Sequence, residues 1–342
     1  MPQTMKAAVV RELGSVALEE VPEPAPNEYQ AVAEVLCWAT CNSTDYRVVR
    51  GNMGWNTPLP LILGHETVGR VVEVGAEVRS YRVGDHLLRV TAVYPGTTMA
   101  GYASALGSFT TLGLATDTAA MQADGLSTEG MAITHFLHQR VPEDMDPADA
   151  AMLINLREAL SWVNKLDVAG RSVLVIGDGP VGLGFVQTAS VKGAAEVILI
   201  GHHEARLEVG RQVGATQTVN GRTVDPLAAV PDLVHGQVDV LVDGTGDQKS
   251  LAAALSLVKA DGKVAAYGSP KIPPTGPKPV DARIVSIRTD EAGAHDEVLR
   301  LVAEGRIVPR RFWSDRLRYE EIGEAIRRIG AREAVGKVVL EP

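Results

Sequence analysis

Six residues near the middle of the chain have the spacing of a phosphate-binding loop. The run Gly177-Asp178-Gly179-Pro180-Val181-Gly182 reads G-x-G-x-x-G; it directly follows the apolar run 172–176 and opens a helical pattern. In that setting the first glycine makes a tight turn and the second lets backbone N–H groups approach a pyrophosphate. The third lets helix and strand pack, and the helix N-terminus faces the anion. The pattern therefore predicts a dinucleotide site, with contacts from Gly177, Gly179, Pro180, Val181 and Gly182.

The residues after the next apolar run indicate which dinucleotide is bound. A site for NAD usually places Asp or Glu about 20 residues beyond the glycines, where the carboxylate accepts hydrogen bonds from the ribose. Here the run 197–200 ends in Gly201-His202-His203, with Arg206 shortly after and no acid at the tip. Imidazole and guanidinium groups can donate to a 2′-phosphate, which favours NADP(H) over NAD. The alternative is that His202 and His203 only cap a helix, with NAD held by backbone contacts.

These residues must be positioned by alternating strands and helices. From about residue 146, apolar runs of strand length alternate with helix-length segments, which is typical of a doubly wound parallel sheet. The first 145 residues instead show short β-runs broken by Gly and Pro, which indicates a β-rich domain. We expect an α/β protein with a β-rich domain over 1–146, a Rossmann domain over 147–290, and a return of 291–342 to the first domain.

Length and composition limit the classes of function. With 342 residues, 45% hydrophobic and 22% charged, the chain is long enough for two folded domains. A formal net charge of −9 and the lack of a Lys/Arg run argue against a nucleic-acid partner. Two cysteines are too few for a disulfide framework or a four-cysteine zinc knot. No run has the length and apolar character of a membrane span or a signal peptide, so we expect a cytoplasmic protein without a membrane partner.

A second motif lies in the β-rich part. The run Gly64-His65-Glu66-Thr67-Val68-Gly69-Arg70-Val71-Val72-Glu73-Val74-Gly75 matches G-H-E-x-x-G-x-V-x-x-V-G, and Val83-Gly84-Asp85 follows it. Together with the nucleotide pattern, this resembles the medium-chain dehydrogenase/reductase superfamily, on the zinc alcohol/polyol dehydrogenase side, over nearly the whole chain. The resemblance implies a GroES-like catalytic domain, a Rossmann domain and hydride transfer between an alcohol and a nicotinamide coenzyme. It also implies a homodimer or tetramer, for which 284–287 is the candidate edge.

The catalytic zinc of the family polarises the substrate oxygen, and this chain matches its ligand pattern in part. His65 and Glu66 are present. The first ligand normally lies three residues before an Asp; relative to Asp45 that position is Asn42, with Cys41 one residue earlier. A one-residue bulge would bring Cys41 into the site. Without it, Asn42 occupies the ligand position, as in the zinc-free quinone-reductase branch of the family.

The remaining ligand position, early in the linking helix, holds Ile154 in an ungapped alignment. Glu158 lies one helical turn further along the same face, where it would reach the metal or serve as a general base in its absence. The alternative is that Glu158 has no functional role and is a carboxylate on the helix surface. We favour one catalytic zinc held by Cys41, His65 and either Glu66 or Glu158.

Three further expectations follow from the resemblance. Thr44 stands where the family keeps a hydroxyl that passes the substrate proton outward, whereas the relay histidine two residues after the Asp is replaced by Arg47. The four-cysteine lobe of the family is missing after Asp85, so no structural zinc is expected. The segment 117–140 is longer than the family needs, and it is either a surface helix and loop or a substrate lid or subunit contact.

The leading prediction is an NAD(P)-dependent secondary-alcohol dehydrogenase that uses zinc. Its small-molecule substrate is expected to be rich in hydroxyl groups, such as a polyol, sugar or cyclitol. The alternative is a zinc-independent, NADPH-dependent quinone or enone reductase, and a third possibility is a non-catalytic dinucleotide-binding protein. The residues expected to be catalytic are Thr44, His65, Glu66 and Glu158.

Overall fold

The computed structural model describes residues 3–54, 57–268 and 281–342, and its contacts divide into two compact units. The first unit is Met1–Ile154 together with Trp313–Pro342, and the second is Asn155–Phe312. The predicted fold class is confirmed, because the first unit consists mainly of short antiparallel strands and the second is built on a parallel sheet. In the described part of the chain, no helix combines the length and apolar composition that crossing a bilayer requires.

Two sheets form the first unit. One has the strand order β2-β1-β4-β8-β7, and the other has the order β10-β6-β5-β3-β17-β16, with β9 paired to β3. The strands of this unit are β1 (Thr4–Val10), β2 (Ala17–Pro22), β3 (Gln30–Ala39), β4 (Leu61–Ile62), β5 (Thr67–Val74), β6 (His86–Leu88), β7 (Thr98–Met99), β8 (Tyr102–Ser104), β9 (Leu112–Thr116), β10 (Arg140–Val141), β16 (Trp313–Arg318) and β17 (Lys337–Glu341). Its helical segments are η1 (Asn42–Tyr46), α1 (Arg47–Val49), α2 (Thr118–Ala123), η2 (Ile133–Phe136), η5 (Tyr319–Glu321) and α9 (Ile322–Ala331).

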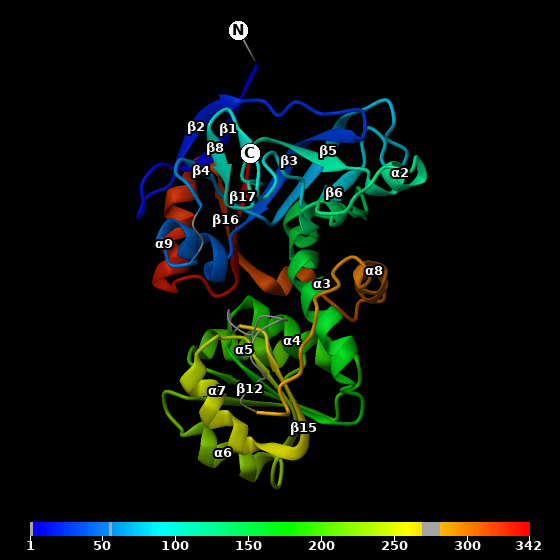
Figure 1. Cartoon of the computed structure of the whole chain (residues 1–342). Helices are drawn as coiled ribbons and strands as arrows, with labels where there is room; N and C mark the ends of the chain where they lie inside the picture. The colour runs from blue at the N-terminus through cyan, green and yellow to red at the C-terminus, as the bar shows by residue number, and fades with distance from the viewer. Residues whose placement is uncertain (1–2, 55–56, 269–280) are drawn as a thin grey trace. The chain divides into compact units, whose positions relative to one another are not determined.

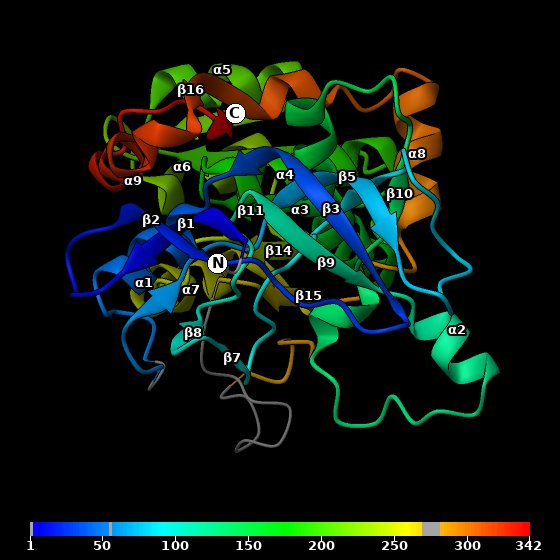
Figure 2. The ribbon, with the colours of Figure 1, turned by 90° about the horizontal axis from the view of Figure 1, so that it is seen from above.

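The long strand β3 organises the first unit, because three other strands pair with it. β5 and β9 run antiparallel to it (Figure 2), and the C-terminal strand β17 pairs with its end (Figure 1), with Val339 opposite Ala39. The side chain of Trp38 on β3 is fully buried and stacks on Tyr319, with ring centroids 3.9 Å apart. The C-terminal residues are thereby tied into the same core as the N-terminal strands.

The segment 117–140 packs back on the first unit through two histidines. The ring of His135 stacks on Tyr94 with centroids 3.6 Å apart, and its Nδ1 lies 2.9 Å from the hydroxyl of Thr116. The hydroxyl of Tyr94 lies 3.0 Å from Nε2 of His138. Partial burial lowers the pKa of His135 from 6.5 to about 4.

We expect this histidine to make stability depend on pH. In the folded protein His135 stays neutral down to about pH 4, whereas in the unfolded chain it gains a proton near pH 6.5. The unfolded state therefore binds more protons between these values, so the free energy of unfolding should fall as pH drops from 6.5 to 4 and level off below. The expected loss is on the order of 1 kcal/mol, because the partly exposed ring is screened by water. Urea unfolding at several pH values measures this slope.

A matched variant isolates the histidine from the other groups that titrate in this range. His135→Phe keeps an aromatic ring against Tyr94 and removes the titrating nitrogen. The slope of stability between pH 6.5 and 4 should be smaller in this variant than in the unmodified protein. Equal slopes in the two proteins would contradict the assignment.

The second unit is a doubly wound sheet with the order β13-β12-β11-β14-β15, all parallel. The order reverses between β11 and β14, and ligands of such sheets bind at this point beside the carboxyl ends of the strands. Its strands are β11 (Ser172–Ile176), β12 (Glu196–Gly201), β13 (Gln217–Asn220), β14 (Val238–Asp243) and β15 (Val258–Ala266). Its helical segments are α4 (Pro180–Val191), α5 (Glu204–Gln212), α6 (Pro226–Leu233), α7 (Gln248–Ala254), η3 (Leu255–Leu257), α8 (His295–Ala303) and η4 (Pro309–Phe312); α3 (Pro147–Leu166) begins in the first unit and ends here.

Residues 291–312 differ from the prediction, since they belong to the second unit rather than the first. Polar contacts explain the difference: Glu297 of α8 binds Lys192 at 2.8 Å, and Gln187 of α4 donates to the carbonyl of Arg306 at 3.2 Å. The chain therefore returns to the first unit at Trp313 instead of residue 291. Among the described residues, the run 284–287 joins the sheet through one parallel bridge, between Ile284 and Val264 of β15.

Candidate active site

The chain makes a π-helical turn, η1, shortly after β3. The N–H of Asp45 donates to the carbonyl of Cys41 at 2.8 Å, and the N–H of Tyr46 lies 3.4 Å from the same carbonyl. Such turns lodge one extra residue in a helix and often mark functional sites. The turn leaves Asn42 exposed and Cys41 buried. Of the two residues considered for the first ligand position, the structure thus turns Cys41 inward.

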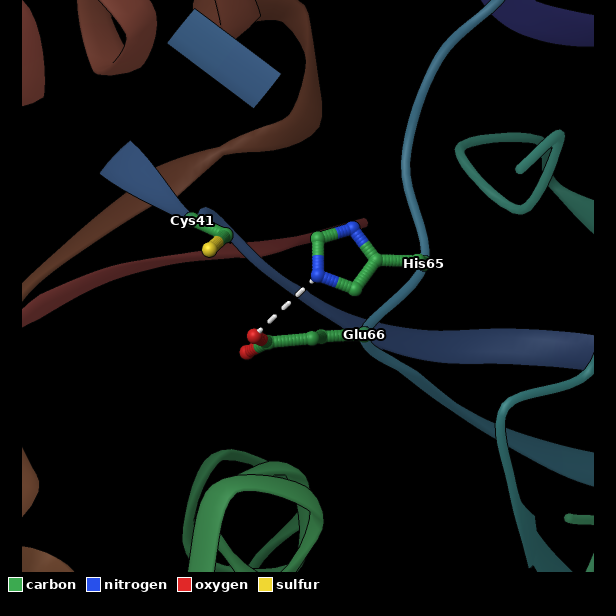
Figure 3. Close-up of side chains that lie close together, drawn as sticks. All are labelled: Cys41, His65 and Glu66. Atoms are coloured by element: carbon green, nitrogen blue, oxygen red, sulfur yellow. Dashed lines mark ion pairs between the residues drawn. The ribbon is translucent and has the colours of Figure 1, made fainter. Parts of the chain in front are cut away.

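Cys41, His65 and Glu66 form a compact cluster (Figure 3). Each has a potential ligand atom, and these atoms all lie within 4.8 Å of one another. Nε2 of His65 is 3.4 Å from Oε1 of Glu66, and the sulfur of Cys41 points toward the same side of the ring. Sulfur, imidazole nitrogen and carboxylate oxygen are the donors that zinc prefers, and three protein ligands leave the fourth position open for chemistry. The cluster therefore fits a catalytic zinc ion.

Asp45 orients two of these residues from behind. Its Oδ2 accepts a hydrogen bond from the backbone N–H of Cys41 at 2.8 Å, which holds the loop. Its Oδ1 lies 3.3 Å from Nδ1 of His65, a contact that sequence did not predict. A carboxylate on the far nitrogen fixes the ring and directs Nε2 at the cluster, as in many metal-binding histidines.

Lys337 is a member of the site that sequence reasoning missed. Its side chain is buried, and its Nζ donates to Oε1 of Glu66 at 2.8 Å and lies 2.6 Å from Oε2. Burial alone would lower the pKa of Lys337, but Glu66 and Cys41 outweigh it and raise the pKa above 10.5. A buried lysine is rare unless it is paired, so a lysine at the start of the final strand, directly before three apolar residues, was the available signal.

The electrostatics of the cluster favour an ionised sulfur and carboxylate. Burial would raise the pKa of Cys41, but Lys337 and the hydrogen bond to His65 outweigh it, so the pKa lies below 9.0. Burial would also raise the pKa of Glu66, and the same two neighbours lower it to about 2. The pKa of His65 is raised because Asp45 and the other acidic groups outweigh burial. The same negative groups would attract a divalent cation in place of that proton.

Two hydroxyls compete for the position of the predicted proton acceptor. Counted back from Asp45 the position is Thr44, but counted forward from Cys41 it is Ser43, because the π turn adds one residue. The hydroxyl of Ser43 lies 3.3 Å from the sulfur of Cys41, and Thr44 is half-buried. The structure therefore makes Ser43 a candidate that the sequence pattern did not single out.

Glu158 lies on α3 within the second unit, whereas the cluster belongs to the first. Its Oε2 accepts a hydrogen bond from the hydroxyl of Tyr267 at 2.9 Å. The ring of Tyr267 meets Trp162 edge to face, with centroids 5.1 Å apart. Glu158 is thus a half-buried carboxylate among aromatic rings, and its place among the ligands stays a prediction.

The glycine-rich loop has the expected geometry. Gly177 follows β11 with φ +111°, a conformation that favours glycine. A Cβ on Gly182 would lie 1.8 Å from the carbonyl oxygen of Gly177, so the third glycine is required for close packing. Gly179 precedes α4 and Pro180 begins it, and a Cβ on Gly179 would meet nothing within 4 Å. Open space before a helix N-terminus suits a pyrophosphate. Val181 lies in the first turn of α4.

The tip of β12 departs from the prediction in one respect. His202, His203 and Arg206 follow Gly201 as expected, but an acid does stand there. It is Asp178 of the glycine-rich loop, whose Oδ2 accepts hydrogen bonds from the backbone N–H groups of His202 and His203 at 2.7 and 2.8 Å. Asp178 lies 24 and 25 positions before these two residues, so no pattern near the end of β12 shows the contact. His203 is the N-cap residue of α5, but its side chain makes no capping hydrogen bond.

Known proteins resemble both units. A family model described as alcohol dehydrogenase GroES-like domain matches residues 30–129, and one described as zinc-binding dehydrogenase matches 180–291. The chain is 28% identical over 275 residues to sorbitol dehydrogenase of Bacillus subtilis (strain 168), covering 79% of this chain and 76% of that protein. It is 30% identical over 273 residues to NADP-dependent isopropanol dehydrogenase of Thermoanaerobacter brockii, covering 76% and 75%. The structure of an alcohol dehydrogenase from Thermotoga maritima, 22% identical, shares the fold with a TM-score of 0.80 over 99% of this chain and 100% of that one.

Proposed function

Because this chain belongs to the zinc-type medium-chain dehydrogenase/reductase superfamily and is an NAD(P)-dependent alcohol dehydrogenase, we propose that it oxidises a hydroxyl-rich secondary alcohol with NADP and one catalytic zinc. The observation that carries the zinc assignment is the cluster of Cys41, His65 and Glu66, backed by Asp45. The substrate class is a polyol, sugar or cyclitol. Two relatives support it, since one is named for sorbitol, a polyol, and the other for isopropanol, a secondary alcohol.

Each residue of the site has its own proposed role. Cys41, His65 and Glu66 hold the metal, and Asp45 keeps the His65 ring aimed at it. When bound, zinc supplies a Lewis acid for the substrate oxygen, and the nicotinamide accepts or donates the hydride. Lys337 neutralises the buried carboxylate of Glu66, so that the site tolerates both a thiolate and a carboxylate away from water. Glu158 remains a proposed further ligand or proton acceptor.

NADP is favoured over NAD by the groups around the tip of β12. His202, His203 and Arg206 lie there, and each can donate a hydrogen bond to a phosphate. The glycine-rich loop and the start of α4 would hold the pyrophosphate. The relative from Thermoanaerobacter brockii is NADP-dependent by name, which supports the same preference.

Ser43→Ala is expected to lower kcat about 100-fold, because this hydroxyl, next to the sulfur of Cys41, would take the proton of the substrate. Thr44→Val, the matched variant at the position predicted from sequence, should change kcat less than tenfold. Steady-state kinetics of both variants at saturating coenzyme make the comparison. The reverse order of effects would return the role to Thr44.

One pair of measurements tests the proposed function. Elemental analysis of the purified protein should find about one zinc per chain, and NADP⁺ reduction followed at 340 nm should be fastest with polyols or other secondary alcohols. A zinc-free protein that reduces enones or quinones with NADPH would overturn the proposal in favour of a reductase. A protein that turns over neither coenzyme with any substrate class would overturn it in favour of a binding protein.

We also propose that copies of the chain pair at the β15 edge of the parallel sheet. There the run 284–287 follows β15, with Ile284 bridged to Val264. Multi-angle light scattering should give the mass of a dimer or tetramer, and a clean monomer would contradict the proposal.

A further inference from the structure

The carboxylate at the tip of β12 is almost closed off by its own partners. Asp178 has a side chain 10% exposed, and its Oδ2 accepts three N–H groups, from the backbone of His202 and His203 and from Nδ1 of His203 at 3.0 Å. Gly201 makes room for it, since a Cβ there would lie 2.5 Å from Cβ of Asp178. Burial would raise the pKa of Asp178, but these N–H groups outweigh it and keep the pKa below 3.8.

Basic side chains surround this carboxylate from two elements. Arg206 of α5 places NH1 3.7 Å from Oδ1 of Asp178, and its side chain is 14% exposed. Arg222, in the loop after β13, places NH2 3.3 Å from Nε2 of His203. Arg222 is exposed, and no carboxylate of the described residues pairs with it. The nearby acid Glu204 is already engaged by Arg211 at 2.6 Å.

The charged side chains around Asp178 and His203 carry a net positive charge. One anion, Asp178, lies beside the guanidinium group of Arg206, and the guanidinium group of Arg222 lies beside Nε2 of His203. Both oxygens of Asp178 have partners, so this carboxylate is poorly placed to accept a ribose hydroxyl as the acids of NAD sites do. A phosphate dianion next to His203 and Arg222 would instead receive charge-assisted hydrogen bonds from the guanidinium group of Arg222 and from Nε2 of His203, which now contact each other.

We infer that Arg222 joins His203 and Arg206 as a ligand of the adenosine 2′-phosphate of NADP, and that Asp178 is the residue that positions the other two. This inference rests on the proposed preference for NADP. It assigns a selectivity role to an aspartate within the glycine-rich loop, where an acid would otherwise be expected to repel a phosphate.

Half-ligands that lack the nicotinamide test the inference separately from catalysis. Titration calorimetry with adenosine 2′,5′-bisphosphate and with 5′-AMP isolates the effect of the 2′-phosphate. Arg222→Gln should weaken binding of the bisphosphate about tenfold or more and leave 5′-AMP within twofold, because only the former contacts the guanidinium. Arg211→Gln is the matched control. It removes a guanidinium group that binds Glu204 and Glu208 and not His203 or Asp178. It should change neither affinity.

The direction of the effect at Asp178 distinguishes the two roles of this carboxylate. Asp178→Asn keeps the shape and removes the charge that holds His203 and Arg206, so the ratio of NADP⁺ to NAD⁺ affinity should fall severalfold. If Asp178 instead served as a ribose acceptor and repelled phosphate, the ratio would rise, and that result would overturn the inference. An unchanged bisphosphate affinity in Arg222→Gln would also overturn it. If the unmodified protein bound neither half-ligand nor either intact coenzyme, the proposed function itself would fail.

Discussion

Cys41→Ala is expected to bring the zinc content close to zero and to lower kcat/KM for the alcohol about 10³-fold. The thiolate is the softest and most strongly binding donor of the cluster, and Lys337 and the hydrogen bond to His65 lower the pKa of Cys41 below its ordinary value, which favours the metal-binding thiolate form. A lost Lewis acid removes several kcal/mol of transition-state stabilisation, which corresponds to about three powers of ten in rate. Elemental analysis and steady-state kinetics on the same preparation measure both effects.

Two neighbouring residues are matched controls for this substitution. Cys37 is the other cysteine, but it is buried in β3 outside the cluster, and burial raises its pKa well above 9.0. Cys37→Ala should therefore retain zinc. Asn42→Ala alters the residue that the sequence pattern placed at the ligand position, and it should retain zinc because Asn42 is exposed. Loss of zinc in Asn42→Ala with retention in Cys41→Ala would refute the assignment.

Arg157→Met is expected to lower the free energy of unfolding by about 3–5 kcal/mol. Arg157 is fully buried on α3, and its NH2 lies 3.2 Å from Oε2 of Glu291, whose side chain is 8% exposed. Removing one partner of such a pair leaves the other charge buried without it, and this cost exceeds what the pair contributed. Guanidinium unfolding followed by circular dichroism gives the change in stability.

A double variant and a surface variant give this prediction its controls. Arg157→Met combined with Glu291→Leu removes both charges, so it should regain much of the lost stability. Arg300→Met breaks an exposed pair with Glu304 at 2.7 Å and should cost less than about 1 kcal/mol. If the double variant were as unstable as Arg157→Met alone, the loss would have to come from packing and not from the loss of Arg157 beside the carboxylate of Glu291.

Features that depend on neighbours in the chain could be predicted well. The β11 strand, the glycine-rich turn and α4 follow one another without interruption, so their apolar period and glycine spacing identified the nucleotide-binding unit. His65 and Glu66 are adjacent within a twelve-residue pattern, and both appear in the cluster. β13 is an example of the opposite kind, because Val219 is the one apolar residue of Gln217–Asn220 and the segment becomes a strand by pairing with β12.

The sequence by itself determined the two kinds of fold, the coenzyme-binding loop and two of the three clustered donors, because each depends on side chains that are close along the chain. Only the tertiary structure decided that Cys41 rather than Asn42 turns inward, since this depends on the π-helical turn that follows β3. It alone brought Lys337 to Glu66 across 271 positions and Asp178 to His203 across 25. Contacts of this kind arise when strands far apart in sequence pair in one sheet, and no local pattern records which partners will meet.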